Sequence, residues 1–466
     1  MLKKISKALL VGSALLAMVG TAQADKEINI FGASAQYEYW TTGAPLFLKS
    51  AAVGCSDADL YHAKKNLVSR DNGIAICHQN LAIKSDGYPS GVPTGTGGTA
   101  GEDTIIRYTT FDSAEGLLAA REENPNGSDA AACPNPAERL LANEAYTTFV
   151  NYATGDIANS DITALKCVNV SLGTADIDPE CFDQRTEGPW TWNQWTPAPG
   201  TSTQWEDAYT AYHDNNDSTN WFESIFAPGD PLPATPWNGM SKANPFVVPF
   251  AFFRNDDANT PVPVDNLTKV QAQMLFSGVI NNWDRFSSTS LPVSLCIRVA
   301  GSGTHATLDW AVVRDFALVQ DATHPDWVAD GMGGYAAPAV YTNKGSTDEV
   351  KCVGNIVGAI GYADADKLSS DTAALACTNN SKGRSCRIAY QGYAPTATNV
   401  AECKYDFWAS NVVYYKNTES STLLTNLIAF MSNNSNMPAA KQNFWAAKSA
   451  LKCDRKDCKS GLRLKP

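Results

Sequence analysis

Short apolar runs alternate along the chain with segments whose apolar residues recur every three or four positions. The run at 27–31 precedes a helical pattern that passes through Leu46, and the run at 104–108 precedes one that begins at Ser113. The same order recurs downstream, with strands predicted at 246–253 and 294–299 and helices at 267–276 and 305–318. Strands alternating with helices predict βαβ units around mostly parallel sheets, which is an α/β fold.

Two segments interrupt this pattern, and the end of the chain resumes it. Residues 85–103 are rich in Gly, and residues 182–245 hold six Trp among Pro, Asn and Asp. Large aromatics in such a segment anchor a loop more often than they stack on a sugar ring or a partner protein, and both interpretations stay open. Near the C-terminus, 405–415 is typical of a strand that returns to an earlier sheet, and 423–431 is typical of a helix packed on it.

The first 24 residues have the features of a secretory signal peptide. Three lysines precede an apolar stretch at 8–20, and the small–x–small pattern of 22–24 predicts cleavage after Ala24. An uncleaved anchor is the alternative, but the apolar stretch is short for crossing a bilayer. The mature protein is therefore expected in the periplasm or secreted.

Charge and composition narrow the class of partner. The 466 residues include 36 Lys and Arg against 48 Asp and Glu, a net charge of −12. Removal of the three signal-peptide lysines leaves 33 against 48, or −15. A nucleic-acid partner needs a basic face, so none is expected. Apolar residues at 44% predict a folded chain long enough for two or three domains.

Twelve cysteines fit an oxidising compartment and predict disulfides. Spacing alone does not fix their connectivity, and the closest spacings favour three pairs, Cys55–Cys77, Cys377–Cys386 and Cys453–Cys458. The sequence has neither a C-x-x-C pair nor an H-E-x-x-H motif, so no metal and no cofactor is expected.

The segment 298–304 (RVAGSGT) runs from a predicted strand into a predicted helix. Gly residues let backbone N–H groups approach a ligand, and a helix N-terminus offers unpaired donors to an anion. Arg298 adds a fork of donors suited to an oxyanion. The alternative is an ordinary strand–helix turn with a Ser or Thr cap. For His305, which follows, a position facing solvent is favoured over a contact with the anion.

Three further junctions offer related chemistry. Ser34 follows the first strand, Ser113 opens a helix, and Asp161 ends the segment 156–161. Each is more often a plain helix cap than a ligand contact. An aspartate beside an anion is repulsive unless the anion carries a proton that the carboxylate accepts.

In their order along the chain, five stretches resemble motifs of the periplasmic phosphate-binding proteins of ABC uptake systems (PstS-like), which have a type II periplasmic binding fold. The stretches are 108–116 (YTTFDSAEG), 156–161 (DIANSD), 276–284 (FSGVINNWD), 298–304 (RVAGSGT) and 358–362 (GAIGY). The resemblance covers roughly 27–165 and 245–450, and leaves 182–245 and the Gly-rich loop as insertions. Ala300 departs from it, because the family commonly has at this position an Asp that pairs with the Arg.

The resemblance implies two α/β lobes with a ligand cleft between them: lobe one over 25–245, lobe two over 246–389, and a return to lobe one over 390–466. It implies that hydrogen phosphate is bound by backbone N–H groups of Ser34 and Ala35 together with Ser113, Asp161, Arg298, Ser302, Gly303 and Thr304. Asp161 would accept the proton of hydrogen phosphate and so reject sulfate, which carries none.

The predicted function is therefore capture of inorganic phosphate by a monomeric, non-enzymatic binding protein that serves a membrane ABC transporter. One alternative is an exported phosphatase on the same fold, although the sequence offers no clear nucleophile or metal ligands beside the phosphate. Another is an extracellular scaffold protein, suggested by the insertions and the disulfides.

Overall fold

The computed structural model describes 26–68, 70–78, 103–111, 113–122, 127–176, 193–194, 239–288, 290–298, 302–314, 339–343, 345–367, 375–380, 383–419, 421–455 and 461–465. The predicted signal peptide and nearly all of both predicted insertions lie outside these residues, as do Cys181 and Cys458.

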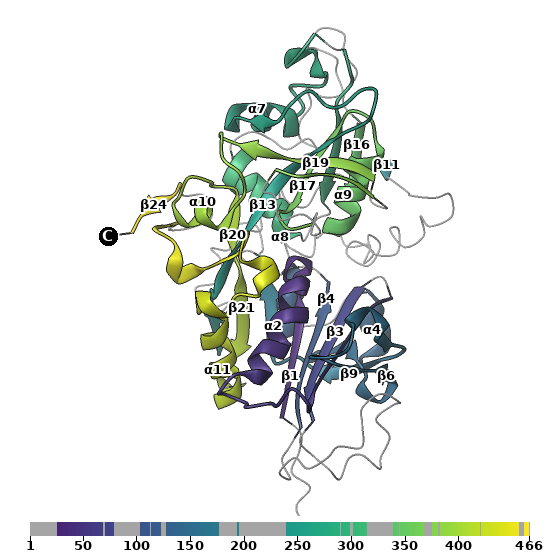
Figure 1. The fold of residues 1–466 in the computed structure, drawn as a ribbon, viewed down its shortest axis with the longest axis vertical. Coiled ribbons are helices and arrows are strands. Elements are labelled where there is room, and N and C mark those ends of the chain that lie inside the picture. Colours follow the sequence, from purple (N-terminus) through teal and green to yellow (C-terminus); the bar gives the residue numbers. More distant parts are fainter. Residues whose placement is uncertain are drawn as a thin grey trace, which may run out of the picture.

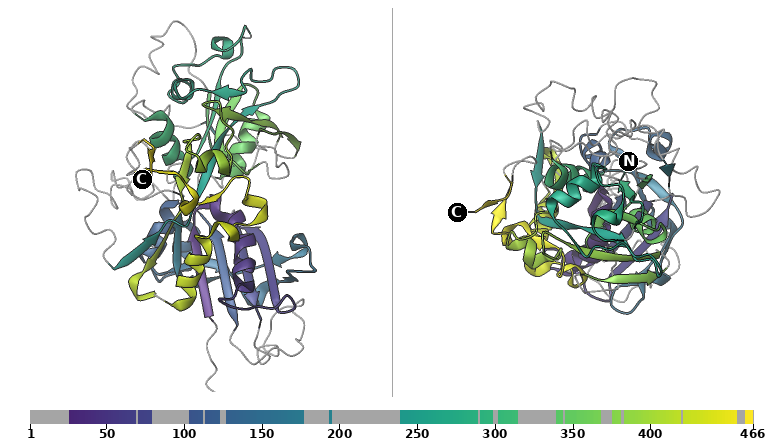
Figure 2. Two further views of the ribbon diagram at one scale, coloured as in Figure 1. Left: turned by 60° about the vertical axis from the view of Figure 1, so that its left-hand side comes forward. Right: turned by 90° about the horizontal axis from the view of Figure 1, so that it is seen from above.

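Two lobes, each built on one large sheet, lie one above the other along the longest axis of the molecule (Figures 1 and 2). The sheet of the first lobe has eight strands, in the order β12 (Met240–Ala243), β21 (Val412–Lys416), β10 (Leu172–Ala175), β1 (Lys26–Gly32), β4 (Thr104–Thr110), β3 (Arg70–Cys77), β2 (Leu60–Leu67) and β7 (Val150–Asn151).

The sheet of the second lobe has ten strands. Seven follow one path, in the order β11 (Asn193–Gln194), β16 (Ala339–Asn343), β15 (Ser294–Arg298), β17 (Ala359–Asp364), β13 (Phe246–Asn255), β19 (Gly383–Tyr390) and β14 (Asn266–Leu267). The other three pair with β19 or β13, and are β18 (Cys377–Asn380), β20 (Trp408–Ser410) and β22 (Ala446–Ala447). Three two-stranded sheets complete the described strands, β5 (Glu138–Ala142) with β9 (Leu165–Asn169), β6 (Thr147–Thr148) with β8 (Asp161–Ile162), and β23 (Cys453–Asp454) with β24 (Arg463–Leu464).

Helices cover the two sheets, and the predicted helices at 113–121, 267–276 and 423–431 have closely similar bounds in the structure. The described α-helices are α2 (Tyr37–Lys49), α3 (Ser113–Ala120), α4 (Gly127–Ala132), α7 (Lys269–Phe276), α8 (Gly303–Thr307), α9 (Ser346–Asn355), α10 (Ala397–Ala401) and α11 (Thr422–Met431). The helix predicted from residue 305 begins two residues earlier, because Ser302 caps it, and it continues as a π-helical segment over Leu308–Val313.

The strand predictions are confirmed, but the expectation of mostly parallel sheets is wrong. In the first sheet, only the pairings of β1 with β4 and with β10 are parallel among the described strands. Hairpins join β2 to β3, and β21 re-enters the sheet antiparallel to β10. An apolar run indicates that a strand is buried on both faces, but it does not indicate the direction of the strand. The antiparallel hairpin pairings could therefore not be predicted from these runs.

Two segments of the chain cross between the lobes. The first joins β12 to β13, and the second joins β20, which pairs with β13, to β21 in the first sheet. The chain thus re-enters the first sheet at Val412, later than the boundary at 390 that the sequence analysis drew. Tyr39 of α2 stacks on Phe246 at the start of β13, with ring centroids 4.5 Å apart, so aromatic packing supports the crossing.

Five disulfides join described cysteines. Two of the predicted pairs, Cys55–Cys77 and Cys377–Cys386, are confirmed. The predicted pair Cys453–Cys458 is wrong, because Cys453 is bonded to Cys403. The backbone N–H of Lys452 donates to the Ala401 carbonyl (2.8 Å), which brings the two segments together. The two remaining pairs, which spacing did not favour, are Cys133–Cys167 and Cys296–Cys352.

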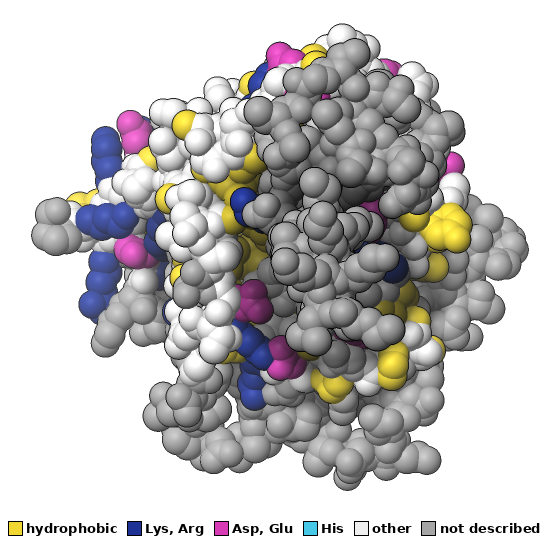
Figure 3. Space-filling model, turned by 90° about the horizontal axis from the view of Figure 1, so that it is seen from below, with side chains coloured by type: hydrophobic (Ala, Val, Ile, Leu, Met, Phe, Trp, Pro, Cys, Tyr) yellow, Lys and Arg dark blue, Asp and Glu magenta, His cyan; other side chains and the backbone are white. Residues whose placement is uncertain are grey.

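Basic side chains gather at one edge of the molecule on the face drawn in Figure 3. These Lys and Arg side chains lie at the edge from which the C-terminus projects in Figure 1. Among the described residues, none of the helices is both long enough and apolar enough to cross a membrane.

Candidate functional site

Three parallel strands of the first lobe end at the same edge of its sheet. Gly32 at the end of β1 lies opposite Thr110 of β4 and Thr174 of β10. The residues that follow these strands are therefore brought together at that edge. They are Ser34 after β1, Ser113 at the start of α3 after β4, and Asp176 after β10. The carboxyl ends of parallel strands are where α/β sheets bind ligands.

The second lobe repeats this arrangement. Arg298 at the end of β15 lies opposite Asn343 at the end of β16, and β17 runs parallel on the other side of β15 and ends at Asp364. Helix α8 follows β15, and α9 follows β16 with Ser346 as its first residue. Each sheet therefore presents a row of polar side chains at one edge.

The two edges meet at Gly303. A Cβ atom placed on Gly303 would lie 2.5 Å from Ser113 Oγ and 2.9 Å from Asp176 Cβ. The first turn of α8 in the second lobe therefore touches the start of α3 and the end of β10 in the first lobe. Only a residue without a side chain lets the two lobes approach this closely.

Replacing Gly303 with alanine is therefore expected to hold the lobes apart and to weaken by about ten- to a hundredfold the binding of the hydrogen phosphate that the resemblance implies, since overpacking costs about 1–3 kcal/mol. Titration calorimetry measures the affinity. Gly73→Ala is the matched control, because the nearest atom to its new Cβ, Thr41 Cγ2, is at an ordinary 3.5 Å. Equal affinity in the two variants would contradict the close contact.

Arg298 is buried at the centre of the second lobe's edge. Its Nη1 donates to Ser346 Oγ (2.8 Å) and its Nε donates to the Asn343 carbonyl (3.3 Å), so neighbouring strand and helix ends fix the guanidinium. Its backbone N–H donates to the hydroxyl of Tyr362 (3.1 Å). A buried guanidinium held in this way is pre-organised to bind an oxyanion.

Asp176 is the buried carboxyl that the first lobe contributes. Its backbone N–H donates to Ser113 Oγ (3.0 Å), and its Oδ1 has no hydrogen-bond partner. Burial raises the pKa of Asp176 to about 8, the negative charge of Asp364 also raises it, and Arg298 acts in the opposite direction. The sequence analysis missed this residue, although a short apolar run ending in Asp, 172–176, was a signal that could have found it.

Asp161, predicted to lie beside the same residues, lies apart from this group. It lies in β8, against β2, and β3 separates β2 from β4. Its side chain is 40% exposed and pairs with Lys65 Nζ at 2.9 Å, which lowers the pKa of Asp161. The segment 156–161 follows β7, the strand at the outer edge of the sheet, so its Asp lies away from the ends of β1, β4 and β10.

In the family that the chain resembles, an Asp at position 300 balances the charge of the Arg. Here position 300 is Ala, and other acids lie near Arg298. Two buried carboxyls of the same lobe, Asp364 and Glu349, interact electrostatically with Arg298. Glu349 accepts from Asn343 Nδ2 (2.9 Å) and from the backbone N–H of Tyr362 (3.3 Å). Burial raises the pKa of Glu349 to about 8.

The other predicted contacts lie along the same two edges. Ser34 is half-buried and Ala35 buried, both in the 3₁₀ turn Ser34–Gln36 that follows β1. Ser302 Oγ accepts the backbone N–H of His305 (3.3 Å), so it caps α8, and Thr304 is buried in the first turn.

His305 does not face solvent. It is fully buried against the hydroxyl of Tyr362, and burial together with Arg298 lowers the pKa of His305 to about 3. It is therefore a neutral partner of Tyr362.

Three of the recognised motifs contribute packing contacts. Trp283 Nε1 donates to the Gly358 carbonyl (2.8 Å), which joins the stretches 276–284 and 358–362. A Cβ on Gly116 would lie 1.9 Å from the carbonyl oxygen of Thr174, so the glycine lets α3 lie directly on β10. This contact sets Ser113 beside Asp176.

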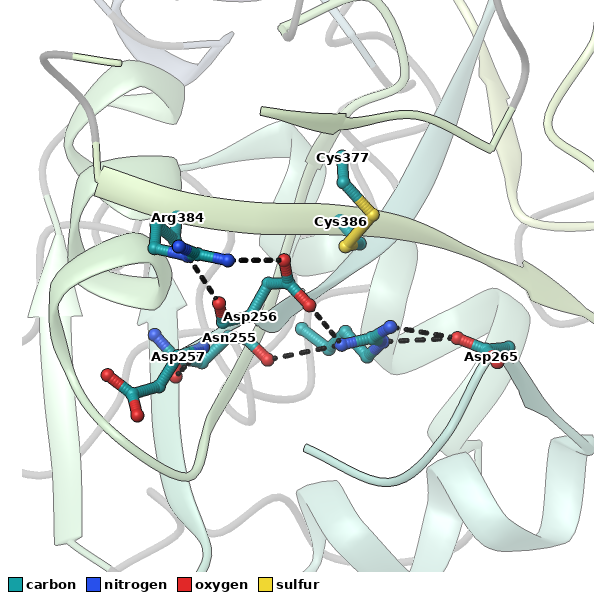
Figure 4. The surroundings of a disulfide bond; sticks show 8 residues. Asn255, Asp256, Asp257, Asp265, Cys377, Arg384 and Cys386 are labelled. Carbon is teal, nitrogen blue, oxygen red and sulfur yellow. Dashed lines mark hydrogen bonds and ion pairs between the residues drawn. A yellow bond between two sulfur atoms is a disulfide. The ribbon is translucent and has the colours of Figure 1, made fainter. Parts of the chain in front are cut away.

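One further group has the spacing of a metal site. Asp256, Cys377 and Cys386 bring their ligand atoms within 4.8 Å of one another. The two cysteines are joined in a disulfide, so they offer no thiolate, and Asp256 accepts from Arg254 and pairs with Arg384 (Figure 4). These contacts describe a structural network around the β18–β19 hairpin.

Residues 238–434 match the model of a PBP superfamily domain, which agrees with the two-lobed fold seen here. Among solved structures, the chain is similar to an ABC-type phosphate transport receptor from Vibrio cholerae (18% identity, 42% of this chain and 68% of that chain, TM-score 0.31). It is also similar to a phosphate-binding protein from Stenotrophomonas maltophilia (10%, 88% and 84%, TM-score 0.38) and to a high affinity periplasmic phosphate-binding protein bound with phosphate (13%, 90% and 90%, TM-score 0.43). These values leave the function to be argued from the chain's own residues.

Proposed function

We propose that this protein binds inorganic phosphate between its two lobes. The observation that carries the proposal is the contact of Gly303, which follows the Arg298 strand end in one lobe, with Ser113 and Asp176 of the other. Arg298 supplies positive charge, Ser113 a hydroxyl, and α8 and α3 the N–H groups of their first turns. Asp176 supplies an acceptor for the proton of a hydrogen phosphate.

Closure of the lobes would exchange the hydration of the anion for fixed donors. The two crossing segments, between β12 and β13 and between β20 and β21, are the places where a hinge motion would bend the chain. Of the eight contacts implied by the resemblance, we retain Ser34, Ala35, Ser113, Arg298, Ser302, Gly303 and Thr304 as proposed ligands. Asp176 replaces Asp161.

The wider role proposed is that of a monomeric capture protein for an ABC-type transporter, in the periplasm or secreted. The predicted signal peptide, the even number of cysteines and the disulfides support export. The fixed guanidinium of Arg298 supplies donors and the carboxyl of Asp176 an acceptor, a pairing that supports binding of a protonated oxyanion.

An anion screen tests the proposal. Titration calorimetry of the purified mature protein with phosphate, arsenate, sulfate and molybdate is expected to give heat of binding with phosphate and with arsenate, which carries protons in the same way. Binding of sulfate or molybdate without phosphate would refute phosphate as the ligand. Absence of heat and of competition with every anion would refute an oxyanion site and favour a scaffold role.

A further inference from the structure

Resting on the proposed phosphate site, we propose that Asp364 is a second carboxyl of that site. It faces Asp176 across the lobe boundary, and together the two acids make the site bind phosphate with one more proton than a single carboxylate would require. In the complex, the anion and the two carboxyls share two protons, which corresponds to dihydrogen phosphate held by two carboxylates. The ligand class is thus a tetrahedral oxyanion able to carry two protons.

The placement of Asp364 follows from the topology of the second lobe. Strand β17 runs parallel to β15, and its last residue is Asp364. Arg298 is the last residue of β15, so the carboxyl and the guanidinium stand at the ends of adjacent strands. The edge that holds Arg298 and Asp364 meets the first lobe at Gly303, where an added Cβ would lie 2.9 Å from Asp176 Cβ, so the two acids stand on edges that face each other.

Both carboxyls keep unused acceptor capacity although they are buried. Asp364 is fully buried, its Oδ2 lies 3.5 Å from Lys367 Nζ, and both of its oxygens keep acceptor capacity beyond that ion pair. Asp176 is 3% exposed and its Oδ1 is also without a hydrogen-bond partner. Buried carboxylate oxygens are normally hydrogen-bonded, so an anion that brings O–H donors would satisfy both residues at once.

The charges around the pair favour a singly charged ligand. The groups that act on Asp176 are Asp364, Arg298, Ser113 and Lys367, and those that act on Asp364 are Lys367, Asp366, Arg298 and Ser346. Lys367 Nζ lies 3.5 Å from Asp364 Oδ2, while Asp366 pairs with Lys441. Arg298 and Lys367 together therefore balance no more than the two carboxylates and leave little positive charge for a dianion.

Burial raises the pKa of both Asp176 and Asp364, which shows that the site holds protons readily. In a complex with phosphate those protons can sit on the carboxyls or on the anion. The pH dependence of the affinity gives the total number of protons in the complex, and does not say which group carries them. The slope of log Kd against pH equals the number of protons taken up on binding.

The test is the pH dependence of phosphate affinity for the wild type and for Asp364→Asn, measured by calorimetry from about pH 9 to pH 10.5, above the pKa of about 8 of Asp176, where the free carboxylate no longer holds a proton. We expect the wild-type affinity to fall with rising pH and to approach about tenfold per pH unit at the alkaline end, as one proton is taken up. In Asp364→Asn the site needs one proton fewer, so its affinity is expected to be nearly flat over the same range. Asp348→Asn, an exposed carboxyl of α9, is the matched control and is expected to follow the wild type.

Proton uptake gives a second measurement that does not depend on the variant. Calorimetry of the wild type at about pH 9, in buffers with different heats of ionisation, is expected to report net uptake approaching one proton per phosphate bound. Zero net uptake by the wild type, or the same slope in Asp364→Asn as in the wild type, would overturn the role of Asp364 while leaving phosphate binding intact. No binding of phosphate by the wild type at any pH would instead overturn the proposed function.

Discussion

Replacing Arg298 with alanine is expected to weaken phosphate binding by about thirtyfold to several thousandfold, because truncating one partner of a buried charge pair costs about 2–5 kcal/mol. The guanidinium is the group at the meeting point of the lobes that is fixed by hydrogen bonds to Ser346 and to the Asn343 carbonyl. Its loss also leaves the acids around it without their common counter-charge. Titration calorimetry with phosphate measures the loss.

The matched control for this substitution is Arg285→Ala, which removes the same charge from a side chain that is 59% exposed in the same lobe. Its phosphate affinity is expected to stay within about twofold of the wild type, since exposed ion pairs contribute at most about 1 kcal/mol. Far-ultraviolet circular dichroism verifies that both variants are folded. Wild-type affinity in a folded Arg298→Ala protein would remove Arg298 from the site.

Asp176→Asn is expected to lower the preference for phosphate over sulfate by about ten- to a hundredfold at about pH 9. Burial raises the pKa of Asp176 to about 8, so its carboxylate is ionised at that pH and accepts the proton of hydrogen phosphate but repels sulfate. An asparagine offers an amide N–H to either anion. The dissociation constants of both anions, measured by calorimetry, give the ratio.

The sign of the pH effect follows from the raised pKa. Below about pH 8 the wild-type Asp176 gains a proton and can donate it to sulfate, so the wild-type preference for phosphate is expected to shrink as pH falls. Asp161→Asn makes the same chemical change at a carboxyl paired with Lys65, and its preference is expected to equal that of the wild type. A loss of preference in Asp161→Asn, with none in Asp176→Asn, would restore the assignment made from the sequence.

The contrast between the two aspartates shows where sequence motifs reach their limit. Residues 156–161 have the letters of a recognised segment, yet they lie in an excursion whose short strands pair with each other and contact β2. Asp176 has little motif around it, but it follows β10, the strand next to β1 in the central sheet. A side chain reaches the neighbouring lobe when its residue follows the end of a central strand. The local sequence motif does not decide this.

Disulfides and charge compensation show the same limit. Cys377–Cys386 was predictable, because a hairpin brings close neighbours together, whereas Cys403 meets Cys453 only after the chain has returned along α10. Similarly, the departure at Ala300 suggested an Arg298 with less compensation. The ends of β17 and α9 supply Asp364 and Glu349 instead, from residues far away in the sequence.

The sequence by itself determined the alternation of strands and helices, the place of Arg298 and the Gly–Ser–Gly turn between a strand and a helix, and the suitability of Ser113 as the start of a helix. These are local properties, set by hydrophobic periodicity, glycine and capping residues. The tertiary structure alone decided which carboxyls face Arg298, that His305 is buried, and which strands are antiparallel. Burial and the meeting of two sheet edges depend on segments hundreds of residues apart, and those contacts leave no local pattern in the sequence.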